Sequence, residues 1–143
     1  KHGHTYQAHP VACAAALAVQ EVIRDEKLLD NAKAMGALLE QGLTERLGNH
    51  ANIGDIRGRG LFWAIELVRD RETREPLVPF NASGADAAPM GAFAAACKKG
   101  GVWPFTHFNR MHVAPPLVIS EDDLVRGLAV LDEALTVADE YAV

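Results

Sequence analysis

The first ten residues hold a dense group of side chains that could do chemistry. Thr5 stands in a polar turn among three histidines, His2, His4 and His9. The turn leads through Pro10 into a run of small apolar residues, which predicts a helix that begins at the proline. A hydroxyl and backbone amides beside a helix start can bind an anion such as a phosphate group, although the same hydroxyl could instead be a local cap.

The three histidines suggest a second use of this turn, because neutral imidazole is a frequent ligand of transition metals. Their spacing does not support it. His2 and His4 alternate as on a strand, His9 lies beyond a turn, and no acid or thiol nearby completes a ligand set. We therefore expect no metal site.

A second candidate group lies in residues 102–120. Arg110 and His112 are two positions apart in a predicted short strand, so their side chains should project from one face. A guanidinium group matches a carboxylate with two parallel hydrogen bonds, so Arg110 is a candidate for carboxylate binding, or else an arginine with no part in catalysis. Four ring side chains precede or flank it, namely Trp103, Phe105, His107 and Phe108. They could line a substrate pocket or cover a core.

Residues 54–67 form a third string, in which arginine and glycine alternate. It lacks the order of strand, glycine-rich loop and helix that a nucleotide phosphate site needs, so we interpret its glycines as turn and bulge positions. We expect Arg57 and Arg59 to pair with Asp55 or Glu66 and to take no part in catalysis.

Hydrophobic periodicity predicts the elements that position these groups. Helices are expected from residue 10 to about 25, from about 28 to 47, from 89 to 99 and from 121 to about 138, and the strands lie between 53 and 68, at 102–104 and at 111–113. Residues 69–88 should form an exposed excursion. Gly48 and Asn49 should end the second helix in a left-handed conformation, and Ser120 should cap the last helix. The alanines of the first helix suit burial at a domain or subunit contact, or packing in a single core.

Composition limits the classes of function. The 143 residues are 49% hydrophobic and 23% charged, which is ordinary for a folded domain. The net charge of −5 argues against nucleic-acid binding, and no apolar run approaches the roughly 20 residues of a membrane helix. The two cysteines, Cys13 and Cys97, have no partners at zinc-ligand spacing, so we expect reduced thiols and a cytoplasmic location.

Three strings, in order, resemble class III pyridoxal-phosphate aminotransferases: His-Gly-x-Thr-x-x-x-His-Pro at the start, residues 54–67, and residues 110–120. The resemblance implies that Thr5 holds the phosphate of pyridoxal 5′-phosphate across a dimer interface. It also implies that His4 borders the other subunit's pocket, and that Arg110 or His112 faces the substrate carboxylate. Ala8 is a departure, because the family commonly has glycine there.

The resemblance also implies a fold class, α/β with an α+β small domain: the C-terminal domain of a fold-type I enzyme, with a short, mostly antiparallel sheet packed with helices. Residues 1–25 would end the large domain or form an interdomain helix, and residues 26–143 would form the small domain. The catalytic lysine of the family lies before the first string, so we expect the C-terminal part of a longer homodimeric enzyme, inactive by itself.

The implied reaction moves an amino group between an amine or amino acid and a 2-oxo acid, as in omega-amino-acid and amine:pyruvate transaminases. One alternative is another class III enzyme with the same cofactor, such as an aminomutase or decarboxylase. The other is a non-enzymatic interaction module of helices and a sheet.

Overall fold

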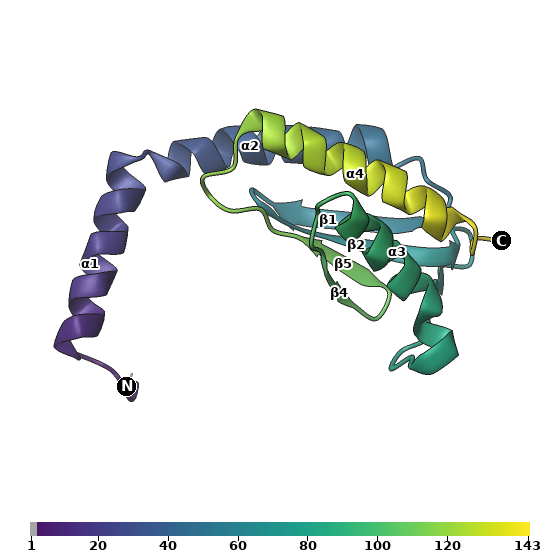
Figure 1. Cartoon of the computed structure of the whole chain (residues 1–143), viewed down its shortest axis with the longest axis horizontal. Coiled ribbons are helices and arrows are strands. Elements are labelled where there is room, and N and C mark those ends of the chain that lie inside the picture. Colours follow the sequence, from purple (N-terminus) through teal and green to yellow (C-terminus); the bar gives the residue numbers. More distant parts are fainter. Residues whose placement is uncertain (1–2) are drawn as a thin grey trace.

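The computed structural model describes residues 3–143. The helices are α1 (Pro10–Asp25), α2 (Leu28–Gly42), α3 (Ala88–Lys99) and α4 (Glu121–Asp139), with a π-helical turn at Leu43–Leu47 and a 3-10 turn at Gly84–Ala87. The strands are β1 (Ile53–Arg59), β2 (Phe62–Asp70), β3 (Glu75–Pro76), β4 (Phe105–His107) and β5 (Arg110–Val113). Figure 1 shows α2 and α4 side by side along the sheet, with α3 packed against α4.

The strands form one antiparallel sheet in the order β1-β2-β5-β4, and β3 pairs with the far end of β2. β1 and β2 form a hairpin that turns at Gly60, whose φ of 58° is in the left-handed region that favours glycine. The expected α/β class, with a short antiparallel sheet packed with helices, is confirmed.

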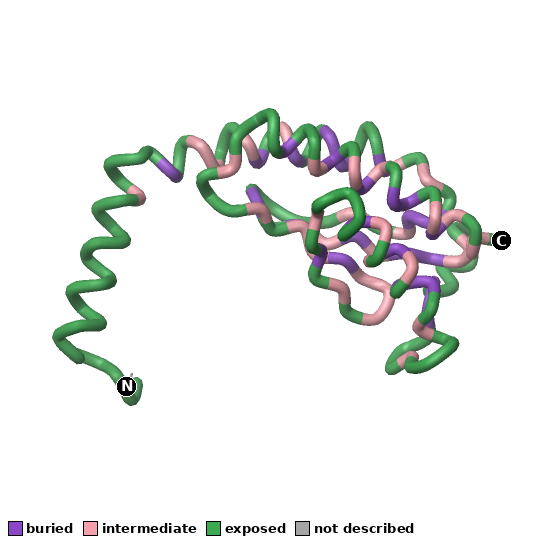
Figure 2. The backbone as a smooth tube through the Cα atoms, viewed as in Figure 1, coloured by how far each residue is buried: buried purple, intermediate pink, exposed green. Residues whose placement is uncertain are grey.

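The core lies between the helices and one face of this sheet. Side chains alternate along β2, so Trp63, Ile65 and Leu67 are buried while Phe62 and Glu66 face the opposite way. The helices add a larger apolar set: Leu39, Leu43, Phe93, Cys97, Leu124, Leu128, Leu131 and Leu135. Figure 2 shows this buried layer between α4 and the sheet. The other face of the sheet has no helix upon it among the described residues.

One contact brings α2 against the β1–β2 turn, backbone to backbone. A Cβ atom added at Gly36 would lie 2.8 Å from the Cα atom of Gly60. Only a residue without a side chain at position 36 allows α2 this approach. A Cβ atom added at Gly60 would meet nothing within 4 Å, so glycine is favoured there by its positive φ and not by this contact.

α1 is separate from this core. None of its 16 residues is buried, and Figures 1 and 2 show it projecting away from the rest of the structure. It ends where Lys27 takes a positive φ of 52° before α2 begins. The interpretation that its alanines pack in the same core as the other helices is wrong for the described chain.

The helix ends follow local chemistry. The Ser120 hydroxyl accepts a hydrogen bond from the Asp123 amide at 3.2 Å, which confirms the predicted cap of α4. After α3, the Val102 amide donates to the Cys97 carbonyl at 2.9 Å and Gly101 has a φ of 90°, as at a glycine-terminated helix end.

Three expectations about local structure are wrong. Gly48 has a right-handed φ of −60°. The position requires glycine for a different reason, because an added Cβ atom would lie 2.5 Å from the Thr44 carbonyl oxygen. The strand expected at residues 102–104 is at Phe105–His107 instead, where pairing with β5 selects it. Residues 69–88 are not simply exposed, since Leu77 and Val78 are buried and the Leu77 amide donates to the Leu67 carbonyl.

Candidate functional site

The polar turn before α1 has free hydrogen-bonding groups. The Gln7 amide donates to the His4 carbonyl at 3.0 Å and closes a turn that contains Thr5, and the His9 amide donates to the Tyr6 carbonyl at 3.2 Å and closes a second turn directly after it. Thr5 is exposed, and among residues 3–143 its hydroxyl has no hydrogen-bond partner. Among the described residues no side chain caps α1, so the amides of Val11 and Ala12 at the helix start also remain available. A phosphate group fits such a turn.

Ala8 gives the physical reason for the glycine that the family commonly has at this position. Its φ is 61°, in the left-handed region, so an alanine here carries strain of about 1 kcal/mol that glycine would not. The turn therefore keeps its shape in spite of the substitution.

The histidines of the turn do not gather. His2 lies outside the described residues, while His4 and His9 are exposed. Within residues 3–143, no three His, Cys, Asp or Glu side chains are placed to hold a metal ion.

The uncovered face of the sheet carries an ionic row. Arg57 bonds to Asp55 beside it on β1 and to Glu66 across the hairpin on β2. The hydrogen bonds of Arg57 to the carboxylates of Glu66 and, to a smaller extent, Asp55 raise its pKa above the usual value. The positive charge of Arg57 is therefore balanced within the sheet. The expected pairing of Arg57 is confirmed. Arg59 forms no ion pair with the described residues, so the same expectation for Arg59 is wrong.

Arg110 lies on the same face as this row, and its guanidinium group has no carboxylate partner among the described residues. It lies opposite Glu66 in the register of β5 with β2, but that carboxylate is held by Arg57. Its guanidinium approaches only the ring of His107, with 3.3 Å between Nη2 and Nδ1, and it forms no ion pair within residues 3–143. Arg110 therefore has donors free for an anion from outside the described chain.

His112 lies in a second, aromatic row on the same face. Its ring centroid is 5.7 Å from that of Phe62 on β2 and 5.3 Å from that of Phe105 on β4. Both phenylalanines are exposed. The predicted common face of Arg110 and His112 is confirmed by their partners in register, Glu66 and Ala64. Phe62 was not identified from the sequence, although its alternation with the buried Trp63 was the signal.

The other ring side chains do not cover the core. Trp103 is 82% exposed, and the Lys98 ammonium group lies 4.4 Å from its ring centroid. Phe108, at the tip of the β4–β5 hairpin, packs on Phe80 and on His107.

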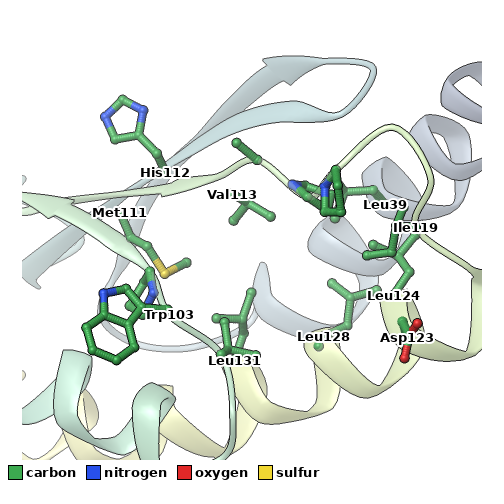
Figure 3. A pocket seen from close by; sticks show the side chains of 16 residues that line it. Leu39, Trp103, Met111, His112, Val113, Ile119, Asp123, Leu124, Leu128 and Leu131 are labelled. Atoms are coloured by element: carbon green, nitrogen blue, oxygen red, sulfur yellow. The ribbon is translucent and has the colours of Figure 1, made fainter. Parts of the chain in front are cut away.

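A cavity of about 290 Å³ lies behind β5, on the helix side. Its lining is mostly apolar and includes Met111, Val113, Leu124, Leu128 and Leu131. Figure 3 shows Met111 turned toward this space and the ring of His112 pointing away from it. The chemistry-bearing groups therefore lie on the uncovered face of the sheet and in the N-terminal turn. The length of α1 separates these two places (Figure 1).

Comparison with known proteins gives a consistent result. The family pattern described as aminotransferase class-III matches residues 1–135. The chain is 39% identical to the ethanolamine-phosphate phospho-lyase homolog 1 of Caenorhabditis elegans, over 93% of this chain and 27% of that protein. It is 37% identical to the 5-aminovalerate aminotransferase of Pseudomonas aeruginosa, over 98% of this chain and 31% of that protein.

Solved structures agree with the fold. An amine transaminase from an uncultivated Pseudomonas species, in its PLP-bound form, matches with a TM-score of 0.81 and 36% identity, over 94% of this chain and 29% of the other. The chain thus spans less than a third of the length of these relatives. The match extends over all three strings and over the fold that carries them, and the chain belongs to the class-III aminotransferase family.

Proposed function

We propose that this chain is the C-terminal part of a pyridoxal-phosphate-dependent aminotransferase, which moves an amino group between an amine or amino acid and a 2-oxo acid. The family match over residues 1–135 carries the proposal. The relatives that it resembles include proteins named as aminotransferases and an amine transaminase with PLP bound. In this proposal the lysine that holds the cofactor belongs to the rest of a longer enzyme, and the chain alone is inactive.

Thr5 would hold the cofactor phosphate in the neighbouring subunit of a homodimer. Its exposed hydroxyl and the free donors at the start of α1 support this role, because an anion needs donors that the protein has not already used. His4 would border the same pocket. When bound, pyridoxal phosphate supplies an electron sink for the reaction, while the protein binds and orients it.

Arg110 would bind the carboxylate of an amino-acid or 2-oxo-acid substrate. Its free guanidinium and its place on an uncovered face support this role. His112 would contact the substrate beside it, and the flanking rings of Phe62 and Phe105 would fix the position of the imidazole and exclude water from it.

The separation of α1 from the core supports a division near residue 25. We infer that residues 1–25 belong with the large domain or lie between the domains, and that residues 26–143 form the small domain. The exposed apolar side chains of α1, Val11, Leu17, Val19 and Val22, then have a surface to contact.

A lyase is the second candidate function. It is favoured by the 39% identity to a protein named as an ethanolamine-phosphate phospho-lyase homolog. The two candidates differ in their products, since a transaminase converts a 2-oxo acid to an amino acid and a phospho-lyase releases inorganic phosphate. Assaying the full-length protein for both products, with amine donors and with phosphoethanolamine, decides between them. Release of phosphate without amination of any 2-oxo acid would contradict the aminotransferase proposal.

Thr5→Ala in the full-length protein tests the cofactor role. Removing a hydrogen bond to a charged group costs about 1.5–3 kcal/mol, so the Kd for pyridoxal phosphate should rise roughly 10- to 100-fold. Titration of the cofactor-free protein, followed by the visible absorbance of the bound cofactor, measures it. Thr44→Ala is the matched control, because that hydroxyl only donates to the Glu40 carbonyl of its own helix. Equal cofactor affinity in the two variants would refute the role of Thr5.

A further inference from the structure

His50 joins two distant parts of the chain through both of its ring nitrogens. Its Nδ1 atom lies 2.8 Å from Oδ2 of Asp139, and its Nε2 atom lies 2.8 Å from Oδ1 of Asp132. The two aspartates are seven residues apart on α4, so they lie on one face two turns apart. His50 itself stands in the turn between the π-helical turn and β1. We name these three residues the His50 bridge.

The protonation state of the ring decides whether both contacts can exist. A neutral imidazole has one N–H donor and one bare nitrogen, and an ionised carboxylate can only accept. With both aspartates ionised, the neutral ring would place a lone pair against one carboxylate oxygen. Only the imidazolium donates to both, so the two 2.8 Å contacts together require the charged ring.

We propose that the His50 bridge is a pH-dependent tie between the turn at residues 48–52 and the C-terminal half of α4. It holds at both ends while the ring is charged, and it releases Asp132 when the ring loses its proton. The His50 bridge then keeps one of its two bonds to α4, the one to Asp139.

The unequal surroundings of the two aspartates determine which end is released. The side chain of Asp139 is 31% exposed and that of Asp132 is 44% exposed. The Oδ1 atom of Asp139 is also buried without a hydrogen-bond partner in the described structure, so this carboxylate depends on His50. Asp132 can be hydrated in place of its bond. A neutral His50 therefore keeps its proton on Nδ1, toward Asp139.

The charged groups that contact His50 determine the pKa of its ring. Asp132 and Asp139 face the ring from α4, and Arg71 donates to the His50 carbonyl from the turn after β2, at 3.4 Å. Burial lowers the pKa of His50, but the hydrogen bonds and charges of the two aspartates outweigh burial and raise the pKa above 6.5. The contribution to stability is therefore complete below pH 6.5 and is lost as the pH rises through the higher, folded-state pKa.

An uncharged contact nearby does not change with pH. The Asn52 side-chain amide donates to the Leu135 carbonyl at 3.2 Å, between the two aspartates along α4. The turn therefore stays attached to the helix when the ring is neutral. We expect local loosening of α4, without global unfolding.

Hydrogen exchange of the full-length protein, read by mass spectrometry at pH 6 and pH 9, tests the proposal. After correction for the intrinsic pH dependence of exchange, peptides that cover residues 128–140 should lose protection roughly three- to tenfold at the higher pH, as expected for one partly exposed bond to a charged group. Asp132→Asn should remove most of this loss. The asparagine side chain can accept from the charged ring or donate to the bare nitrogen of the neutral ring.

Asp122→Asn is the matched control, because it removes an exposed carboxylate from the first turn of the same helix. It should keep the pH dependence of the wild type. His50→Gln should have the lower protection at both pH values, which separates loss of the bridge from a general effect of pH. Equal pH dependence in Asp132→Asn and in the wild type would overturn the proposal, and so would wild-type protection that does not change between the two pH values.

Discussion

Replacing Gly36 with alanine tests the closest approach between a helix and the sheet. Gly36 is buried in the middle of α2 and faces Gly60 in the β1–β2 turn. The added Cβ atom would lie 2.8 Å from the Cα atom of Gly60 and 3.0 Å from its carbonyl carbon. Because these neighbours are backbone atoms, they cannot move aside as the end of a side chain can.

Two opposing effects determine the result. Alanine in a helix interior is more favourable than glycine by about 1 kcal/mol. Overpacking a filled site costs about 1–3 kcal/mol, because α2 or the turn must shift. Gly36→Ala should therefore lower the free energy of unfolding by up to about 2 kcal/mol. The loss is larger if the β1–β2 turn cannot shift away from α2.

Gly127→Ala in α4 isolates the overpacking effect. An added Cβ atom there meets nothing within 4 Å, so this variant should gain the full helix propensity of about 1 kcal/mol. The two variants should differ by about 1–3 kcal/mol, measured by urea unfolding of the 143-residue chain. Tryptophan fluorescence is the probe, because unfolding exposes the buried Trp63 while Trp103 is already exposed. If Gly36→Ala stabilises as much as Gly127→Ala, the close contact of α2 with the hairpin turn is refuted.

Three further substitutions or reactions test local features. Ala8→Gly should relieve the left-handed strain at φ 61° and slow the hydrogen exchange of the neighbouring turn amides, by a factor that corresponds to at most about 1 kcal/mol; faster exchange would contradict the turn geometry. Ser120→Ala should lower the free energy of unfolding by about 1 kcal/mol through loss of the α4 cap, and an unchanged urea midpoint would show that the cap contributes nothing. Burial raises the pKa of the Cys97 thiol to about 11, so a thiol reagent at pH 8 should label the exposed Cys13 in the folded chain and label Cys97 only after unfolding.

Local patterns predicted most of the helices and the sheet class. The periodicity of residues 121–138 and the Ser120 cap place α4 correctly, because both signals lie within a few residues of the helix itself. Strand β4 was misplaced by three residues, because its position depends on the pairing of Phe105 with His112 and not on local propensity. Leu77 was expected to lie in an exposed segment because the prolines on either side of Leu77 and Val78 suggested a loop, and its hydrogen bond to Leu67 on β2 is a long-range contact that local sequence does not indicate.

In the candidate site, contacts within one strand could be predicted from the sequence, while contacts between distant segments could not. Alternation along one strand placed Arg110 and His112 on a common face, and proximity in sequence predicted the pair of Arg57 with Asp55. The neighbours of His112 could not be predicted, since they depend on the order of three strands. The His50 bridge is a stronger case, because its partners follow 82 and 89 residues later with no spacing pattern that connects them.

The isolation of α1 has a consequence for when that segment becomes ordered. A single helix of 16 residues is only marginally stable in water, and most helical stability in proteins comes from packing an apolar face, which α1 does not do here. We therefore expect residues 10–25 to become fully helical only when α1 packs against another protein surface. The helix should fray when that contact is lost. A spectroscopic label on α1 would then report assembly, while the same label on α4 would report folding.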